Sequence, residues 1–494
     1  MTYAQKLTSA YKTAITTLKG RLIVPYQREG VVWMLDRELT ETHRIKGGFL
    51  CDEMGLGKTV QTISLILGNP DLKTLIIVPK SIVDQWFSEI ARFAPQLKVL
   101  VHDGSSRTRD PSTFTDYDVV ITPYTTMVER NQPHGTPTVV HKVDWGRVIL
   151  DEGHEIRNPK SKISVSICNL TAINRWVLTG TPVFNRLKDF ITLCKFIGIP
   201  KEGVQGALQS IRNRYVLRRT KEDVAGFNER LKLPPCDFAN VKISMTADEK
   251  EFYDHVYNKC RERLKRIQVS TTLSKSIYIM EQILRIRQIM VHPQIYLNGM
   301  AKKHQTPPQV WDSNVSKIDK LCGMVSEHPT ESTLIFCQFI EEMNIIQGRM
   351  EKMEKKVYRI DGSISREERV MEIDKFRKTP GCVFLIQIKA GGVGLNLQDA
   401  TRVYITSPAW NPAVELQAIA RAHRTGQTKK VTVRKLYYDF DDDEVNPSVE
   451  YAIMQLQNHK SIVCSEVLND ERVASQIPVP RKLGIKDIQK IFRI

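Results

Sequence analysis

The strongest chemical signal in this chain is a glycine-containing segment, residues 51–59, with the sequence Cys-Asp-Glu-Met-Gly-Leu-Gly-Lys-Thr. It follows an apolar pair, residues 49–50, and precedes a helix-like run, residues 60–67, which gives the order strand, glycine loop, helix. In that order, backbone N–H groups and the N-terminus of the helix form a cradle for phosphate groups. Lys58 would reach the β- and γ-phosphates of a nucleotide, and the hydroxyl of Thr59 would bind Mg²⁺.

This loop departs from the common pattern G-x-x-x-x-G-K-[ST] at its first position, where Asp52 stands. A plain turn between two buried elements is a fair alternative for the glycines alone. A second signal favours the nucleotide site, because an apolar run, residues 148–150, ends in Asp151 and Glu152. Asp151 would hold Mg²⁺ through water, and Glu152 would orient and deprotonate the attacking water. Together the two segments predict hydrolysis of a nucleoside triphosphate.

Two arginines in the second half of the chain, Arg421 and Arg424, add a further feature of a nucleotide site. Their spacing of three predicts that both lie on one face of a helix. Guanidinium groups aimed the same way could meet phosphates and stabilise the charge of a transition state. A basic surface helix with ordinary ion pairs is the alternative. Upstream, the glycine-rich residues 389–396 could bring backbone N–H groups close to phosphates or to a nucleic-acid backbone.

Composition bounds the class of protein. The 494 residues, 41% hydrophobic and 26% charged, are enough for two or more domains with full cores. A net charge of +17 indicates a polyanionic partner, and nucleic acid suits an ATPase better than a membrane surface. No stretch is long and apolar enough to span a bilayer. The nine cysteines include no C-x-x-C pair, which argues against a zinc finger and for a reducing compartment.

The elements that must position these residues alternate between short apolar strands and helical segments. Over residues 20–220, and again after a polar connector at residues 301–308, this alternation predicts an α/β fold with doubly wound parallel sheets. Between residues 185 and 300, helical periodicity replaces the strand pattern. The expected strands are residues 49–50, 75–79, 119–123, 148–150, 176–182, 334–337, 357–360, 383–386 and 403–405. The expected helices include residues 249–264, 276–290, 366–378 and 412–423.

The order of these motifs resembles that of superfamily 2 helicases, and within them the SWI/SNF-related DNA translocases, over residues 24–437. The first half supplies Pro25-Tyr26-Gln27, residues 52–59, Pro79-Lys80-Ser81, Gln85-Trp86, Thr122-Pro123-Tyr124, residues 151–158, residues 178–182 and Asn185. Residues 218–221 and 284–293 are marks of this branch. The second half adds residues 391–396, Trp410-Asn411-Pro412 and residues 423–427. Ala420, where many relatives have Asp, and Gln387-Ile388, where Ser or Thr is common, depart from the family pattern.

The resemblance implies two RecA-like lobes with a helical insertion between them, at residues 1–230, 231–313 and 314–494. It implies ATP and Mg²⁺ as cofactors, with Lys58, Glu152, Arg421 and Arg424 as catalytic residues and with Thr59 and Asp151 holding the metal. The implied ATP contacts are Gln27, as the reader of adenine, and Asp52, Glu53, Met54, Gly55, Leu56, Gly57, Lys58 and Thr59. The implied DNA contacts are Lys80, Gln85, Trp86, Thr181, Lys389, Gly391, Gly392 and Trp410.

The activity that the resemblance implies is ATP-driven movement along duplex DNA, with displacement or remodelling of bound proteins such as nucleosomes. A nuclear location would follow from the DNA substrate. The details look closest to repair and replication-fork translocases, but the cysteines of their RING finger are absent, so ubiquitin ligase activity is not expected. The size resembles that of the baculovirus global-transactivator-like proteins. A strand-separating DNA or RNA helicase and a noncatalytic DNA-binding transcription cofactor remain alternatives.

Overall fold

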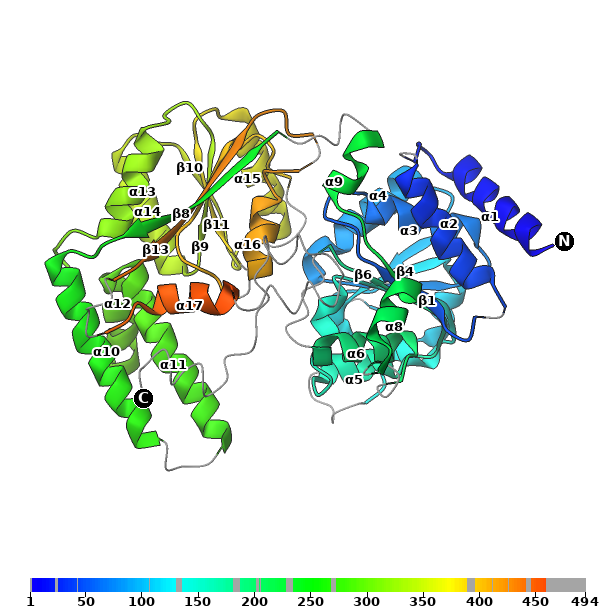
Figure 1. Ribbon diagram of the computed structural model, residues 1–494, viewed down its shortest axis with the longest axis horizontal. Coiled ribbons are helices and arrows are strands. Elements are labelled where there is room, and N and C mark those ends of the chain that lie inside the picture. The colour runs from blue at the N-terminus through cyan, green and yellow to red at the C-terminus, as the bar shows by residue number, and fades with distance from the viewer. Residues whose placement is uncertain are drawn as a thin grey trace. The chain divides into compact units, whose positions relative to one another are not determined.

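Apolar strands of the first half of the chain form one all-parallel sheet in the computed structural model (Figure 1). The structure describes residues 2–22, 25–41, 43–105, 107–129, 136–180, 187–200, 204, 206–227, 234–267, 272–388, 396–410, 412–424, 426–440 and 446–458. These residues fall into two units, divided between residues 227 and 234. Each unit is built around its own sheet, so each is described by itself.

The seven strands of the first unit have the order β3-β4-β2-β5-β6-β1-β7. They are β1 (Lys46–Leu50), β2 (Thr74–Val78), β3 (Val99–Val101), β4 (Val119–Pro123), β5 (Trp145–Asp151), β6 (Ala172–Leu178) and β7 (Val216–Leu217). Every residue of β2 and β4 is buried, because helices cover both faces of the sheet. The helices are α1 (Tyr3–Thr17), α2 (Tyr26–Leu39), α3 (Lys58–Gly68), α4 (Val83–Phe93), α5 (Lys162–Cys168), α6 (Leu187–Ile197), α8 (Leu208–Tyr215) and α9 (Lys221–Val224).

The second unit has a six-stranded parallel sheet with the order β10-β11-β9-β12-β13-β8. Its strands are β8 (Cys236–Ile243), β9 (Thr333–Cys337), β10 (Val357–Ile360), β11 (Val383–Gln387), β12 (Arg402–Ile405) and β13 (Val431–Tyr438). Its helices are α10 (Ala247–Ile267), α11 (Thr272–Val291), α12 (Pro293–His304), α13 (Ser316–Ser326), α14 (Ile340–Lys352), α15 (Arg366–Lys378), α16 (Pro412–Ile419) and α17 (Val449–Asn458). The predicted α/β class with two parallel sheets is confirmed.

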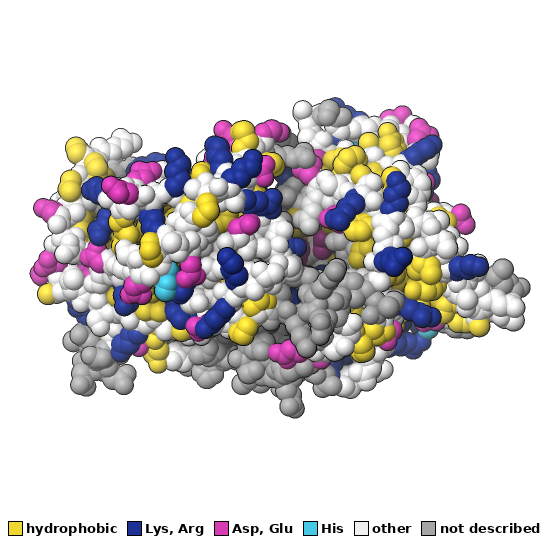
Figure 2. Space-filling model, turned by 90° about the horizontal axis from the view of Figure 1, so that it is seen from above, with side chains coloured by type: hydrophobic (Ala, Val, Ile, Leu, Met, Phe, Trp, Pro, Cys, Tyr) yellow, Lys and Arg dark blue, Asp and Glu magenta, His cyan; other side chains and the backbone are white. Residues whose placement is uncertain are grey.

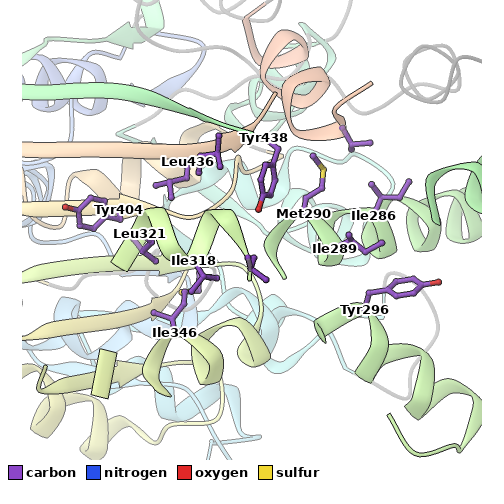
Figure 3. Packing of buried hydrophobic residues seen from close by; sticks show 14 of the residues in the cluster. Ile286, Ile289, Met290, Tyr296, Ile318, Leu321, Ile346, Tyr404, Leu436 and Tyr438 are labelled. Carbon is purple, nitrogen blue, oxygen red and sulfur yellow. The ribbon is translucent and has the colours of Figure 1, made fainter. Parts of the chain in front are cut away.

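The largest core cluster of the second unit joins its sheet to helix α11 (Figure 3). Ile286, Ile289 and Met290 of α11 are at most 1% exposed and belong to the same cluster as Leu321 of α13 and Leu436 of β13. The long helices α10 and α11 extend away from the sheet beyond this contact (Figure 1). The helical segment between the halves is therefore anchored on the second sheet by apolar packing.

Strand β8 was not expected, because the sequence between residues 185 and 300 was interpreted as helical. It lies at the edge of the second sheet and pairs with β13 along its whole length, from Cys236 opposite Val431 to Ile243 opposite Tyr438. An edge strand has one neighbour and one covered face, so its residues alternate between exposed and half-buried, and no apolar run marks it. Strand β7 was not predicted either, because its two residues are too few to form an apolar run.

A buried ion pair holds the first unit together at a distance from its glycine loop. Arg147 of β5 donates to both carboxylate oxygens of Glu38 on α2, at 2.6 and 2.5 Å, and both side chains are 0% exposed. The indole of Trp176 donates to the same carboxylate at 2.8 Å. The carboxylate thus has several donors, which a buried charge requires.

We expect Arg147→Met to lower the free energy of unfolding of the first unit by about 3–5 kcal/mol, because Glu38 would stay buried without its counter-charge. Urea unfolding followed by circular dichroism measures the change. A loss smaller than about 1 kcal/mol, the value typical of exposed pairs, would contradict the burial of this pair.

None of the helices that the structure describes is long and apolar enough to cross a membrane.

Candidate active site

The glycine loop lies between the end of β1 at Leu50 and the start of α3 at Lys58. Gly55 and Gly57 have φ values of 93° and 78°, which side-chain-bearing residues rarely adopt. A Cβ atom on Gly57 would also lie 2.4 Å from Nε2 of Gln27. Both the backbone angles and this close approach therefore require glycine, and the loop wraps tightly around the N-terminus of α3.

Lys58 lies at the carboxyl ends of β1 and β6, which pair in parallel. Its Nζ donates to the carbonyl oxygen of Asp52 at 2.7 Å and lies 3.4 Å from that of Glu53. A Cβ atom on Gly180, just after β6, would be 3.0 Å from the same Nζ and 2.4 Å from Met54 Cγ. The ammonium group is thus enclosed by the loop and by Gly180, at the sheet edge where phosphates bind in such folds.

Gln27, the expected reader of adenine, lies beside the loop. It is 3% exposed, and its Nε2 donates to the Leu56 carbonyl at 3.1 Å and to the Tyr26 hydroxyl at 3.2 Å. These bonds fix the amide against the loop. A contact with the base stays a prediction.

The side chain of Asp52 has its hydrogen-bond partners inside the first unit. Its side chain is 0% exposed, and the carboxylate accepts from Arg219 Nε at 2.9 Å and from Gln61 Nε2 at 3.1 Å. The carboxylate is therefore paired inside the first unit, and a contact between Asp52 and ATP stays a prediction. Only the backbone carbonyl of Asp52 points toward Lys58. A carboxylate can replace the usual glycine here because an arginine neutralises it.

The two acidic residues lie at the end of β5, as predicted. Asp151 accepts a hydrogen bond from Trp86 Nε1 at Oδ2, 2.7 Å away, and from the Glu152 backbone at Oδ1, 3.0 Å away. The hydroxyl of Tyr124 donates to the Asp151 carbonyl at 2.9 Å. Trp86 and Tyr124 thus hold both the side chain and the backbone of Asp151, and neither contact was foreseen because the partners are far apart in sequence.

Burial and the adjacent charge of Glu152 raise the pKa of Asp151 to about 6, against the lowering effects of the Trp86 hydrogen bond and the Lys58 charge. A divalent cation beside this carboxylate would favour its ionised form, so the residue fits a Mg²⁺ site. No group of three or more His, Cys, Asp or Glu side chains that could hold a metal occurs in the described part of the chain. Mg²⁺ at nucleotide sites needs only one or two protein oxygens, with waters and phosphates completing the shell.

Glu152 follows Asp151 in a left-handed conformation, with φ of 51°. Its Oε2 lies 3.3 Å from Nδ1 of His154, and both side chains are about one-fifth exposed. Burial alone would lower the pKa of His154, but its contact with Glu152 and the charges of Glu152 and Glu155 outweigh burial and raise that pKa. The imidazole thus lies against the Glu152 carboxylate and helps to fix its position, which a general base requires.

Trp86, an expected DNA contact, is 2% exposed, so its ring is not available to a macromolecule. The expectation is corrected: the conspicuous aromatic residue of this motif packs inward and orients Asp151. Its neighbour Gln85 is exposed on α4, and Lys80 in the turn before that helix is 68% exposed, 3.8 Å from Asp103. Those two residues are accessible to a nucleic acid.

We expect Trp86→Phe to raise the Mg²⁺ concentration for half-maximal ATP hydrolysis by about 10- to 100-fold, the usual effect of removing an outer hydrogen bond to a metal ligand. The matched control is Trp145→Phe, because Trp145 is equally buried but its Nε1 donates to the Val140 carbonyl. An unchanged Mg²⁺ requirement in Trp86→Phe, or an equal shift in the control, would contradict the role assigned to Trp86.

The expected arginine pair lies in the second unit but not on one helix face. Helix α16 ends at Ile419, and the chain continues in a turn whose Arg421 N–H donates to the Ala418 carbonyl at 3.1 Å. Arg421 is 5% exposed, whereas Arg424 is half-buried. Arg424 is therefore the more accessible of the two.

Backbone and side-chain contacts fix the segment around Arg424. The carbonyl of Arg424 accepts from the Gln427 N–H at 2.9 Å, and Gln427 Nε2 donates to the Gln398 carbonyl at 2.8 Å. His423 Nε2 lies 2.8 Å from the Pro234 carbonyl. This rigid support is what a precisely aimed guanidinium needs.

Trp410, another expected DNA contact, is half-buried after β12. The guanidinium of Arg287 on α11 lies 5.3 Å from its ring centre and donates to the Pro408 carbonyl at 2.8 Å. Thr181, Lys389, Gly391 and Gly392, also predicted to contact DNA, lie outside the described residues. The DNA contacts expected of these residues and of Trp410 stay predictions.

Taken together, two parallel α/β units, the first with a phosphate loop and paired acids at its sheet edge, define the class of two-lobed helicase-like proteins. The family model "SNF2-related domain" matches residues 26–205 and 201–295, and "Helicase conserved C-terminal domain" matches residues 316–426. This chain belongs to the SNF2-related family.

Two curated relatives agree with that assignment. The Bacillus subtilis protein named "Putative ATP-dependent helicase/translocase YwqA" is 30% identical over 97% of this chain and 51% of its own length. The "Probable global transactivator" of Orgyia pseudotsugata multicapsid polyhedrosis virus is 27% identical over 96% of this chain and 94% of its own. This chain thus spans about half the length of the bacterial relative and nearly all of the viral one. The SWI2/SNF2 ATPase core of Sulfolobus solfataricus in complex with dsDNA is 26% identical, with 96% of this chain and 97% of that chain covered and a TM-score of 0.41.

Proposed function

We propose that this protein hydrolyses ATP to move along duplex DNA and to displace or remodel proteins bound there. The observation that carries the proposal is Lys58 enclosed by the loop at the same sheet edge as Asp151 and Glu152, in a chain of the SNF2-related family. The printed name of the bacterial relative, a helicase/translocase, supports movement along nucleic acid. The printed name of the viral relative, a global transactivator, supports a role in transcription. A DNA substrate in eukaryotic cells would give a nuclear location.

In this proposal each residue of the nucleotide site has one role. Lys58 and the backbone of residues 53–57 bind the phosphates, and Gln27 reads the base. Thr59 and Asp151 would hold Mg²⁺, which when bound supplies charge to neutralise the β- and γ-phosphates. Glu152, oriented by His154, accepts the proton of the attacking water as its oxygen bonds to the γ-phosphorus and the ADP oxygen leaves.

The nucleic-acid track would be bound through its phosphates. Lys and Arg side chains are spread over both units on the face drawn in Figure 2, and the net charge is +17. Lys80 and Gln85 are the accessible candidates in the first unit. Phosphate contacts carry no sequence information, so binding is expected to be independent of sequence.

We expect the affinity for duplex DNA to fall as the salt concentration rises, because binding releases cations from the DNA. The expected slope is about 0.9 log units of affinity per log unit of salt concentration for each phosphate contact. Lys80→Ala should reduce that slope by about 1. Fluorescence anisotropy of labelled duplexes between low and physiological salt measures both. Lys12→Ala on α1, an exposed lysine outside the nucleic-acid motifs, is the control, and an equal change there would remove Lys80 from the interface.

The deciding experiment measures ATP hydrolysis by the purified protein alone and with single-stranded DNA, duplex DNA or RNA, beside Lys58→Ala. Strong stimulation by duplex DNA, with no activity in Lys58→Ala, is the expected result and leads to displacement assays on nucleosomes and other DNA-bound proteins. Preference for single strands or RNA would instead favour the strand-separating helicase. No hydrolysis under any condition would favour the noncatalytic transcription cofactor.

A further inference from the structure

A short segment after β7, residues 218–221, runs beside the phosphate loop of the first unit. Strand β7 pairs with the end of β1, with Val216 opposite Phe49 and Leu217 opposite Leu50. The backbone ladder then continues into the loop, because the Cys51 N–H donates to the Leu217 carbonyl at 2.7 Å and the Glu53 N–H to the Arg219 carbonyl at 2.9 Å. The first residues of the loop are therefore held as an extension of the sheet.

Side chains of the same segment reinforce this pairing. Lys221 Nζ lies 3.2 Å from Oε1 of Glu53, and the Lys221 N–H donates to Oε2 of Glu53 at 2.9 Å. Arg218 donates to the Cys51 carbonyl at 3.3 Å. Three consecutive loop residues, 51–53, thus have partners in residues 217–221.

Arg219 lies at the centre of these contacts. Its guanidinium donates to both oxygens of Asp52, to Gln61 Oε1 at 3.0 Å and to the Tyr26 carbonyl. Gln61 on α3 closes the set, because its Nε2 donates to Asp52 and, at 3.3 Å, to the Leu56 carbonyl. Arg219 therefore joins the start of α2, the beginning of the phosphate loop and the first turns of α3, and Gln61 extends the set to Leu56 near the other end of the loop.

We propose that Arg219 is a positioning residue for ATP binding, acting on Lys58 through Asp52. The carbonyl of Asp52 accepts the Lys58 ammonium at 2.7 Å, so a shift of Asp52 moves the group that meets the phosphates. Asp52 is fully buried, and without Arg219 its carboxylate would have to leave the interior or take up a proton. This inference rests on the proposed nucleotide site and explains why that site works with aspartate in place of glycine.

The test compares Arg219→Met, Asp52→Asn and the double variant by titration with a fluorescent ATP analogue and Mg²⁺, and by steady-state ATP hydrolysis. Arg219→Met should raise the Kd for the analogue, and KM with it, by about tenfold or more, since tenfold needs a change of only about 1.4 kcal/mol. The double variant, in which Asp52→Asn is added to Arg219→Met, should recover most of the affinity for the analogue, because the added substitution removes the uncompensated charge. Arg219→Lys, which keeps the charge but not the two-pronged contact, should lie between Arg219→Met and wild type.

The matched control is Arg147→Met, which breaks a more deeply buried Arg–carboxylate pair in the same unit but away from the loop. It should lower the unfolding midpoint with no change in Kd for the analogue. Wild-type Kd in Arg219→Met, no recovery in the double variant, or an equal loss in Arg147→Met would overturn the proposal. Failure of wild type itself to bind or hydrolyse ATP would overturn the proposed function instead, so the two failures are distinguishable.

Discussion

Glu152→Gln is expected to lower kcat for ATP hydrolysis by about 10²- to 10⁴-fold, the usual contribution of a general base, with little change in ATP or duplex DNA binding. The amide keeps the size of the side chain and cannot accept the proton of the attacking water. Glu152 follows Asp151 directly at the sheet edge, and its carboxylate lies 3.3 Å from His154 Nδ1, so its position is set before substrate arrives.

The companion variant Lys58→Ala separates binding from chemistry. It should also abolish turnover, but through loss of phosphate affinity, so the Kd for an ATP analogue should rise in Lys58→Ala and stay close to wild type in Glu152→Gln. Duplex affinity measured by anisotropy should be near wild type in both. Turnover close to wild type in either variant would refute this assignment of the nucleotide site.

Arg424→Ala is expected to leave ATP binding intact and to reduce DNA-stimulated hydrolysis by about 10³- to 10⁵-fold, the range found for arginine fingers. An arginine finger acts on charge that develops in the transition state, so loss of the Arg424 guanidinium should lower kcat more than it changes KM. Arg424 is the stronger candidate of the pair because Arg421 is 5% exposed.

The matched control for this experiment is Arg434→Ala in the same unit. Arg434 lies on β13 and forms an ion pair with Asp237 at 3.2 Å, in which both partners are partly exposed. The Arg434→Ala variant should hydrolyse ATP at a rate close to that of the wild type. If Arg424→Ala lost nucleotide binding, or if its kcat equalled that of Arg434→Ala, Arg424 would not be a finger.

Local pattern was enough to predict much of the fold and of the ATP site. Several central parallel strands are covered on both faces and appear as apolar runs, and the predicted strands at residues 75–79 and 334–337 coincide with β2 and β9 within a residue. The glycine loop, Lys58 and the two acids were found because their chemistry needs fixed types at short spacing. The edge strand β8 was not predicted, because a strand with only one neighbouring strand does not need an apolar run.

The helix expected to carry Arg421 and Arg424 shows another limit of local pattern. The sequence around both residues is compatible with a helix, but α16 ends at Ile419. Two residues later, the Arg421 carbonyl accepts a hydrogen bond from the Leu397 N–H at 3.0 Å. This bond to a distant loop replaces the next helical turn. Contacts of that kind cannot be seen in a window of neighbouring residues.

The sequence by itself determined the class of chemistry: a phosphate loop with Lys58, acids at the end of a strand, a basic chain and the motif order of one family. Only the tertiary structure decided which of these side chains are buried and which distant residues pair with them. Asp52 and Arg219, 167 residues apart, neutralise each other, and Trp86 turns inward to Asp151, 65 residues away. The physical reason is that burial and charge pairing depend on which surfaces the folded chain brings together, whereas loop and strand chemistry is encoded by neighbours in sequence.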